Sequence, residues 1–302
     1  MNITDLRVSR DTTLKGLGKQ LASTGLQSSE LARAAAISRR MLADQHCTRF
    51  MSLTSNLMAT GLRGLFIDMA EAKRFHGVVA AGGALDHDIL RAFRSYQLGS
   101  FEDDDTQLHQ QDVNRLGNIH IPNAHYVFLE KWLQPVLKRV HDETHPVSAS
   151  ALAFEIGKQL HQQRKRSFLA SCYRHRIPVY SPGLVDSAIG LQLYFYKQDH
   201  PSFSLDATGD MPELATTLLA SKRTGAWILG GGISKHYTIA SNLLRGGLDY
   251  AVYLTTAFER DGSLSGAHTR EAKSWGKVRS TGQTAVVHAE ATLAFPLLYA
   301  LL

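Results

Sequence analysis

Hydrophobic and polar positions along the chain predict short buried strands that alternate with helices. An amphipathic pattern over residues 28–41 predicts a helix near the start of the chain, and the apolar run 50–53 predicts a short extended segment. Later apolar residues come in short runs that end at glycine, proline or small polar residues. Such runs are typical of strands that are buried on both faces of a sheet.

The first of these later runs is followed by two glycines and a helical pattern. Residues 75–81 predict a buried strand, and we expect Gly82-Gly83 to form the turn after it. The next helix is then expected to begin at Asp86 or Asp88, because carboxylates favour the first turn of a helix.

The same arrangement occurs again further along the chain. Residues 226–229 predict a strand and Gly230-Gly231-Gly232 its turn. Ser234 is then the expected N-cap of a helix that ends near Arg245, just before Gly246-Gly247.

Further strands are predicted at residues 177–180, 250–254 and 286–288. Strands that are separated by helices imply a mainly parallel sheet with helices on both faces. We therefore predict an α/β protein with a single domain over residues 1–302, in which residues 1–45 form a helical N-terminal extension.

The composition is that of an ordinary globular protein, with 302 residues, 44% of them apolar and 20% charged. The net charge of +6 would suit a nucleic-acid partner, but the basic residues are scattered. The clearest basic cluster, Arg164-Lys165-Arg166, is interpreted as a solvated helix end. We predict no nucleic-acid partner.

Neither end of the chain indicates a membrane or export. Residues 1–20 carry several charges and no apolar stretch of signal-peptide length, and the apolar tail 291–302 is interrupted by Pro296. Cys47 and Cys172 are far apart and form no CxxC motif, so we expect both to be reduced and buried. We predict a cytoplasmic protein without a membrane partner.

One lysine stands in a setting that suggests covalent chemistry. Lys277 ends the segment Ser274-Trp275-Gly276-Lys277. A neutral lysine amine attacks carbonyl or imine carbon, whereas the ammonium form is inert, so a reactive lysine must be desolvated or lie near another cation. The alternative is a surface lysine in a polar loop.

The two glycine turns could hold a phosphate. Glycines directly after a parallel strand let a phosphate approach the backbone, and the following helix supplies free N–H groups. The turns at Gly82-Gly83 and Gly230-Gly231-Gly232 would together suit a dinucleotide, and a lysine in a nucleotide-binding fold suggests imine chemistry. The first turn lacks a complete GxGxxG, and either could be a simple tight turn.

Other candidate site residues lie close to these in the sequence. His236 could move protons at neutral pH, or it could be an exposed histidine at a helix start. The small residues of 261–266 are typical of a loop that closes over a site. Glu271 could offer a carboxylate to a cationic substrate and Trp275 an apolar or cation-π wall, the alternatives being a solvated glutamate and core packing.

A possible metal site is not supported. His141 and His145 have helical i,i+4 spacing, but Pro146 follows directly and no third ligand is near. The order of residues is also not HExxH. We interpret the segment as a solvated helix end and predict no metal.

Several motifs together resemble the deoxyhypusine synthase family, in the same order and over nearly the whole chain. They are Thr54-Ser55-Asn56-Leu57, Ala81-Gly82-Gly83, Asn114-Arg115-Leu116-Gly117-Asn118, Ile121-Pro122-Asn123, Ile177-Pro178-Val179-Tyr180-Ser181-Pro182, Gly230-Gly231-Gly232, Lys235-His236, Asp249-Tyr250-Ala251-Val252-Tyr253, Asp261-Gly262-Ser263, Ser274-Trp275-Gly276-Lys277 and Phe295-Pro296-Leu297-Leu298.

The resemblance implies a Rossmann-like fold, a homotetramer and NAD as the cofactor. In the family, a hydride is taken from spermidine, the aminobutyl group is carried as an imine on a lysine, and it is passed to a lysine of a translation factor, which becomes hypusine. By this resemblance Lys277 is the nucleophile, His236 the proton carrier, and Trp275 and Glu271 bind the substrate. The positions that match NAD contacts are Asn56, Ala81, Gly82, Asp186, Gly231, Gly232, Thr256, Ala257 and Glu290.

The chain departs from the family pattern at the polyamine site. Leu191 and Leu264 occupy substrate-binding positions where the family has aspartates. Ala240 replaces an expected asparagine, and the paired acids of the family become Leu85-Asp86-His87-Asp88 with a one-residue insertion. An ammonium buried without its counter-charge costs several kcal/mol, so we do not expect spermidine to bind in the usual way.

We therefore expect a deoxyhypusine synthase-like, NAD-dependent aminobutyl-type transferase that acts through a lysine imine. The donor would be a polyamine or another small amine altered from spermidine, and the acceptor a protein or a small amine. Homospermidine synthesis is the nearest precedent. The alternatives are a catalytically inactive NAD-binding paralogue that regulates an active homologue, and an amine dehydrogenase that transfers no group.

Overall fold

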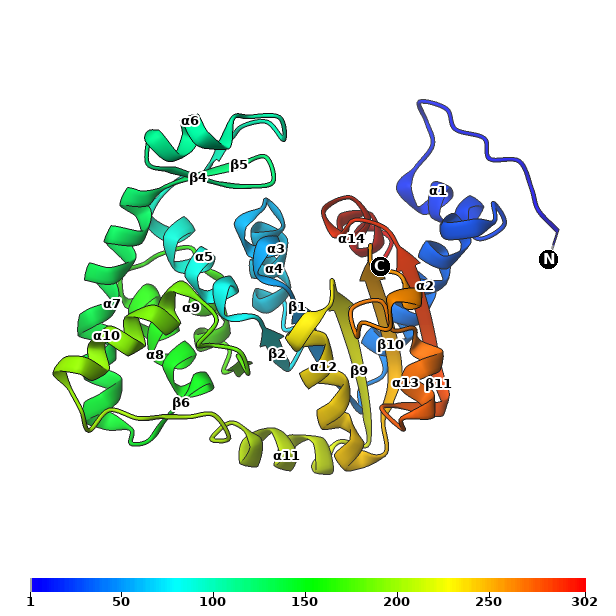
Figure 1. The fold of residues 1–302 in the computed structure, drawn as a ribbon. Helices are drawn as coiled ribbons and strands as arrows, with labels where there is room; N and C mark the ends of the chain where they lie inside the picture. Colours follow the sequence, from blue (N-terminus) through cyan, green and yellow to red (C-terminus); the bar gives the residue numbers. More distant parts are fainter. Residues whose placement is uncertain (1) are drawn as a thin grey trace. The chain divides into compact units, whose positions relative to one another are not determined.

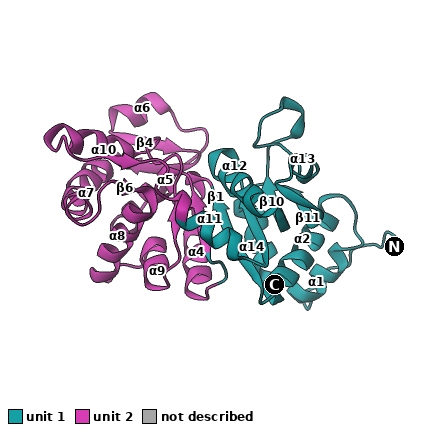
Figure 2. Ribbon diagram, turned by 90° about the horizontal axis from the view of Figure 1, so that it is seen from below, with its two compact units in different colours: residues 1–53, 74–76, 213–302 teal, residues 54–73, 77–212 magenta. Residues whose placement is uncertain are grey.

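The computed structural model describes residues 2–302, which form two compact units. The prediction of a single domain stays a prediction, and the two units are described separately below. Figure 2 shows unit 1, which comprises Met1–Leu53, Arg74–His76 and Glu213–Leu302, and unit 2, which comprises Thr54–Lys73 and Gly77–Pro212.

Unit 1 contains a parallel sheet in which the strands follow the order β11, β10, β9, β1. In the sheet register, Ala226 of β9 lies opposite Phe50 of β1 on one side and Ala251 of β10 on the other. Residues 226–229 of β9 and 251–254 of β10 are apolar and buried on both faces, because helices cover both sides of the sheet there. Their bounds are β1 (Cys47–Leu53), β9 (Arg223–Leu229), β10 (Leu248–Thr255) and β11 (Val278–His288).

Helices α2 and α14 cover one face of this sheet, and α12 and α13 cover the other (Figure 1). Trp227 of β9 donates its Nε1–H to Ser38 of α2 at 2.9 Å, while Lys235 of α12 lies over the ring of Tyr253 of β10 on the opposite face. The helical segments that lie wholly or mostly in this unit are α1 (Leu14–Leu21), α2 (Leu26–Ala43), α11 (Met211–Ala220), α12 (Gly232–Ser241), η1 (Asn242–Arg245), η2 (Glu259–Asp261), α13 (Thr269–Ser274) and α14 (Ala291–Ala300).

Unit 2 is mainly helical and contains the short parallel pair β2 (Gly77–Ala80) and β7 (Val179–Tyr180), in which Val78 lies opposite Val179. Its core is formed by fully buried leucine and isoleucine side chains on the facing helices α5, α7 and α8. The helices are α3 (Ser55–Ala59), α4 (Leu62–Glu71), α5 (Gly82–Phe93), α6 (Asp105–Gln110), α7 (Asn123–Glu143), α8 (Ala149–Gln162), α9 (Phe168–Arg174) and α10 (Ala188–Asp199).

Two smaller sheets complete unit 2. Strands β3 (Gln97–Leu98), β5 (Ile119–Pro122) and β4 (Val113–Leu116) are antiparallel, and β6 (Val147–Ser148) pairs in parallel with β8 (Leu205–Asp206).

The predicted α/β class with a mainly parallel sheet and flanking helices is confirmed, and so are most predicted elements. The helix expected at 28–41 is α2, and the predicted strands correspond to β1, β2, β7, β9, β10 and β11. Strand β11 is much longer than expected and begins at Val278, so Lys277 stands directly at the start of a strand.

The predicted start of α5 was wrong. The helix begins at Gly82, and Asp86 and Asp88 do not cap it. Each carboxylate instead accepts backbone N–H bonds from the first turn of a different helix: Asp86 from α10, at 2.8 and 3.0 Å, and Asp88 from α9, at 2.9 and 2.8 Å. The two carboxylates therefore do stabilise the first turns of helices, as expected of acidic side chains, but tertiary packing places them at helices other than their own.

The predicted N-cap of α12 was also wrong, although the helix itself is present. The helix begins at Gly232, and the Ser234 hydroxyl donates to the carbonyl of Gly231 at 3.2 Å. The end of the segment is as predicted: the helix continues as the 3-10 turn η1 up to Gly246, whose φ of +83° is a left-handed conformation that favours glycine.

No helix within residues 2–302 is long and apolar enough to span a membrane. In the same part of the chain, no three His, Cys, Asp or Glu side chains are grouped to hold a metal. His141 instead shares a hydrogen bond with the hydroxyl of Tyr196 at 3.2 Å. Cys47 and Cys172 are free and buried, as expected from their spacing.

Candidate active site

Lys277 lies between α13 and β11 in unit 1. Gly276 has a φ of +71°, so the turn before the lysine needs a residue that accepts the left-handed region. The backbone of Lys277 makes two hydrogen bonds. Its N–H donates to the carbonyl of Ala272 at 2.9 Å, and its carbonyl accepts the N–H of Leu248 at 3.0 Å. The side chain is half-buried.

Trp275 forms one wall beside this lysine. Nζ of Lys277 lies 5.1 Å from the centroid of the Trp275 ring system, within the range of a cation-π contact. Trp275 is 65% exposed, which argues against core packing as its role. The ring therefore offers an apolar surface next to the amine.

His236 stands near the start of α12 and is the predicted proton carrier. Partial burial of its ring, and then the positive charge of Lys277, lower the pKa of His236. The two side chains are thus close enough to interact electrostatically. A histidine with a lowered pKa is neutral at pH 7 and can accept a proton.

The glycine turn after β9 is covered by a segment that we call the strap, residues 256–268, which joins β10 to α13. The N–H of Gly232 donates to the hydroxyl of Ser265 in the strap at 2.9 Å. A Cβ at Gly231 would lie 2.5 Å from the Cβ of Ser265, so only glycine allows this approach. The predicted loop 261–266 therefore packs directly on the turn, with Leu264 half-exposed.

Glu271 lies in the first turn of α13 and is exposed. Its carboxylate interacts electrostatically with Lys235, raising the pKa of that lysine against the larger, opposite effect of burial. Lys235 donates from Nζ to two strap carbonyls, those of Ser265 and Ala267.

The other cofactor residues predicted in unit 1 lie where parallel strands end. Thr256 is exposed directly after β10, and the N–H of Ala257 bonds to the Thr255 hydroxyl at 3.1 Å. Glu290 is the N-cap of α14 and accepts the N–H groups of Thr292 at 2.8 Å and Leu293 at 3.2 Å. The carboxyl edge of a parallel sheet is the usual place for a nucleotide.

A buried polar atom at this edge supports a ligand there. Nδ1 of His288, at the end of β11, is buried and has no hydrogen-bond partner among residues 2–302. Its ring stacks on Phe258 of the strap, with centroids 5.4 Å apart, and Phe258 is 68% exposed. Together with the glycine turn, this edge fits a dinucleotide.

Unit 2 contains the remaining predicted residues. Asn56 accepts a hydrogen bond from Thr54 at 2.6 Å, and Ala81 precedes the first residue of α5, Gly82. A Cβ at Gly82 would lie 2.8 Å from the Cβ of Ser187, so the start of α5 touches the segment before α10.

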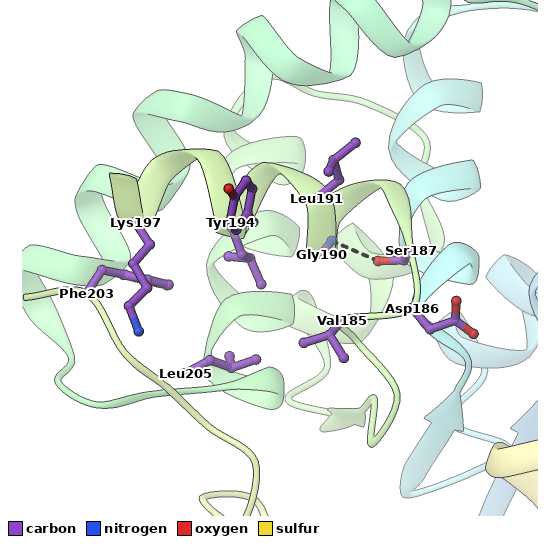
Figure 3. Close-up of a pocket in the computed structure, with 10 residues that line it drawn as sticks. Val185, Asp186, Ser187, Gly190, Leu191, Tyr194, Lys197, Phe203 and Leu205 are labelled. Atoms are coloured by element: carbon purple, nitrogen blue, oxygen red, sulfur yellow. Dashed lines mark hydrogen bonds between the residues drawn. The ribbon is translucent and has the colours of Figure 1, made fainter. Parts of the chain in front are cut away.

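Asp186 and Leu191 line a cavity of about 700 Å³ beside α10. Figure 3 shows Asp186 before the start of this helix and Lys197 near its end, with Leu191 and Tyr194 between them. The wall is largely apolar, and its full lining is Val185, Asp186, Ser187, Gly190, Leu191, Leu193, Tyr194, Lys197, Phe203 and Leu205.

The sequence model of deoxyhypusine synthase matches residues 16–302. The chain belongs to the deoxyhypusine synthase family. It is 40% identical over 278 residues to a probable deoxyhypusine synthase from Sulfolobus acidocaldarius, covering 91% of this chain and 88% of that one. It is 39% identical over 305 residues to the Ignicoccus hospitalis protein of the same name, covering 99% and 94%.

A solved structure from Entamoeba histolytica that is also named as a deoxyhypusine synthase has the same fold, with a TM-score of 0.72. The two sequences are 23% identical, and the match covers 99% of this chain and 96% of that one. The family indicated by the motifs is thus confirmed. Membership of the deoxyhypusine synthase family supports an aminobutyl transferase.

Reasoning from the sequence missed three residues near the predicted deoxyhypusine synthase site: Lys235, Ser265 and His288. A signal for the first was available. Residues 235, 238, 239 and 242 have the spacing of one helix face, and all four are buried. A lysine on such a face must find internal partners.

Asp86 accepts two backbone N–H groups at the start of α10 and so holds the segment that carries Leu191. Asp86 is only 4% exposed. Burial raises the pKa of Asp86 to about 6, although the two backbone N–H bonds from α10 act in the opposite direction. The charged form is therefore destabilised in the folded protein.

The raised pKa of Asp86 predicts a pH dependence of stability. Between the ordinary pKa near 3.8 and the folded value of about 6, Asp86 binds more protons in the folded protein than in the unfolded chain. The contribution of Asp86 to the free energy of unfolding therefore decreases as pH rises through this range. We expect the free energy of unfolding of wild type to fall by about 2–3 kcal/mol relative to Asp86→Asn across that window. Urea unfolding of both proteins at several pH values would measure it, and a difference that does not change with pH would contradict it.

Proposed function

We propose that this chain is an NAD-dependent aminoalkyl transferase that carries the transferred group as an imine on Lys277, with an amine donor other than spermidine. The observation that carries the proposal is the arrangement at the end of α13. There a half-buried lysine lies 5.1 Å from an exposed tryptophan ring and interacts with a histidine of lowered pKa. A nucleophile, an apolar wall and a proton acceptor are thus combined in one unit.

NAD is supported by the fit of unit 1 to a dinucleotide. Gly231, Gly232, Thr256, Ala257 and Glu290 would hold it at the carboxyl edge of the sheet in unit 1. Asn56, Ala81, Gly82 and Asp186, which match NAD contacts by the family resemblance, lie in unit 2, and their role in binding NAD stays a prediction. When bound, NAD would accept a hydride from the carbon that carries the donor nitrogen and later return it.

The residues of the chain would perform the remaining steps. Loss of a hydride and a proton turns the donor amine into an imine, and His236 takes the proton. The neutral Nζ of Lys277 then attacks the imine carbon, and the C–N bond to the original nitrogen breaks as that amine leaves with a proton. The acceptor amine attacks the Lys277 imine in the same way and releases the lysine.

The donor is proposed to differ from spermidine because of two leucines. Leu264 is half-exposed on the strap, and Leu191 is 53% exposed on α10. Neither can compensate an ammonium group, and leaving a desolvated cation unpaired costs several kcal/mol. Glu271 remains as a carboxylate that can bind one cationic nitrogen. We therefore propose a donor amine that has fewer cationic groups than spermidine or that carries an apolar substituent.

We also propose a homotetramer in the cytoplasm, with either a protein lysine or a small amine as acceptor. Exposed apolar side chains of the same unit support association of subunits, for example Ile233 and Leu243, which are both 47% exposed.

The decisive experiment is chemical trapping. The pure protein is incubated with NAD and each member of a panel of amines and treated with borohydride, which reduces an imine to a stable secondary amine, and the peptides are examined by mass spectrometry. We expect an added mass on Lys277, and its size identifies the transferred group. NAD binding without any adduct would favour the regulatory paralogue, and NADH release with free aldehyde would favour an amine dehydrogenase.

A further inference from the structure

Lys235 is the most deeply buried charged side chain near the candidate site, with 0% exposure. Its Nζ donates to the carbonyl of Ser265 at 3.0 Å and to the carbonyl of Ala267 at 2.8 Å. The same atom lies 4.7 Å from the centroid of the Tyr253 ring. A lysine is rarely buried so completely, and here two carbonyl oxygens and an aromatic face replace water.

Lys235 is not arranged to be the nucleophile. Burial lowers its pKa to about 8, as a reactive lysine requires, but its amine cannot be reached from solvent and two of its N–H groups are engaged. Lys277 is half-buried and lies beside an exposed ring, so it is the accessible amine. The two lysines therefore have different tasks.

The carbonyls that Lys235 holds belong to the strap and flank Gly266. A Cβ at Gly266 would lie 1.7 Å from the carbonyl oxygen of Phe258, so the strap is folded tightly on itself at this point. Ser265 in turn accepts the N–H of Gly232 at 2.9 Å. The position of the strap on the glycine turn thus depends on contacts that meet at Lys235 and Ser265.

We propose that Lys235 is a positioning residue: by holding the carbonyls of Ser265 and Ala267, it fixes the strap on the Gly231-Gly232 turn and thereby sets the place of Leu264 in the amine site. This inference rests on the proposed function, because Leu264 matters only if an amine binds there. Lys235 acts through the strap and makes no contact with the substrate.

The first test measures the strap without any substrate. In Lys235→Met the chain length is nearly kept but the donors are lost, and we expect amide hydrogen exchange in residues 256–268 to become at least about tenfold faster, because charged hydrogen bonds to two carbonyls are removed. Lys235→Arg keeps donors and should restore part of the protection. Lys273→Met is the matched control: its Nζ makes one bond to a carbonyl, that of Ser280 at 2.9 Å, outside the strap.

The second test separates positioning from chemistry. We expect Lys235→Met to raise KM for the amine at least about tenfold while kcat changes only a few-fold, since Lys277 is untouched. If the strap stays protected in Lys235→Met, or if kcat collapses while KM does not change, the inference is wrong. Should Lys235→Met not fold, Ser265→Ala, which removes the bond to Gly232, must show faster strap exchange of the same kind, and unchanged exchange would overturn the inference.

The two proposals can fail separately. Absence of a trapped adduct with every amine would defeat the proposed function but leave the hydrogen-exchange result on the strap intact. A trapped adduct on Lys277 together with an unchanged strap in Lys235→Met would defeat only the inference about Lys235.

Discussion

Replacing Lys277 by alanine is expected to lower kcat for group transfer by at least about 10³-fold and to abolish the borohydride-trapped adduct, because the amine that forms the imine is lost. Lys235 cannot substitute, since it is completely buried and its Nζ holds two carbonyls. Steady-state transfer assays and peptide mass spectrometry would measure both effects.

Two variants control for the loss of Lys277. Lys277→Arg keeps the positive charge near His236 but has no nucleophilic amine, so it should be as inactive as alanine while NAD still binds. Lys273→Met removes a lysine of the same helix, α13, whose Nζ contacts the carbonyl of Ser280, and should retain activity. Full turnover in Lys277→Ala would show that the proposed mechanism is wrong.

Replacing Asp88 by alanine is expected to have the largest effect on stability, about 3–5 kcal/mol, because it breaks a buried ion pair and leaves its arginine uncompensated. The Asp88 side chain is 0% exposed and accepts from Nε of Arg63 at 2.7 Å, from the Ser167 hydroxyl at 2.7 Å and from two N–H groups of α9 at 2.9 and 2.8 Å. One carboxylate therefore joins α4, α5 and α9 in unit 2.

Equilibrium urea unfolding followed by circular dichroism would test the role of Asp88. Asp68→Ala is the matched control, because Asp68 pairs with Arg166 at 3.1 Å in an ion pair whose side chains are 66% and 67% exposed. Such a surface pair contributes about 1 kcal/mol or less. If both variants lose the same small amount of stability, the Asp88 carboxylate does not stabilise the packing of α4, α5 and α9 as its contacts indicate.

The local pattern predicted most strands and the two helices that follow glycine pairs, because these elements depend on short-range periodicity and on the conformational freedom of glycine. It was wrong about how two of these helices begin. Asp86 and Asp88 have the chemistry of helix caps, but their partners are α10 and α9, which are distant in sequence. A single sequence gives no information on which helix a carboxylate will meet.

The sequence by itself determined the family and the candidate residues, since motifs such as Ser274-Trp275-Gly276-Lys277 require only residue identity and order. Only the tertiary structure decided which lysine is accessible and which is a buried anchor. Lys235 and Lys277 have the same side chain, but exposure and hydrogen-bond partners differ between them: one amine is enclosed by strap carbonyls and the other lies beside Trp275. The reactivity of an amine depends on its surroundings, and the surroundings are set by segments that are far apart in the chain.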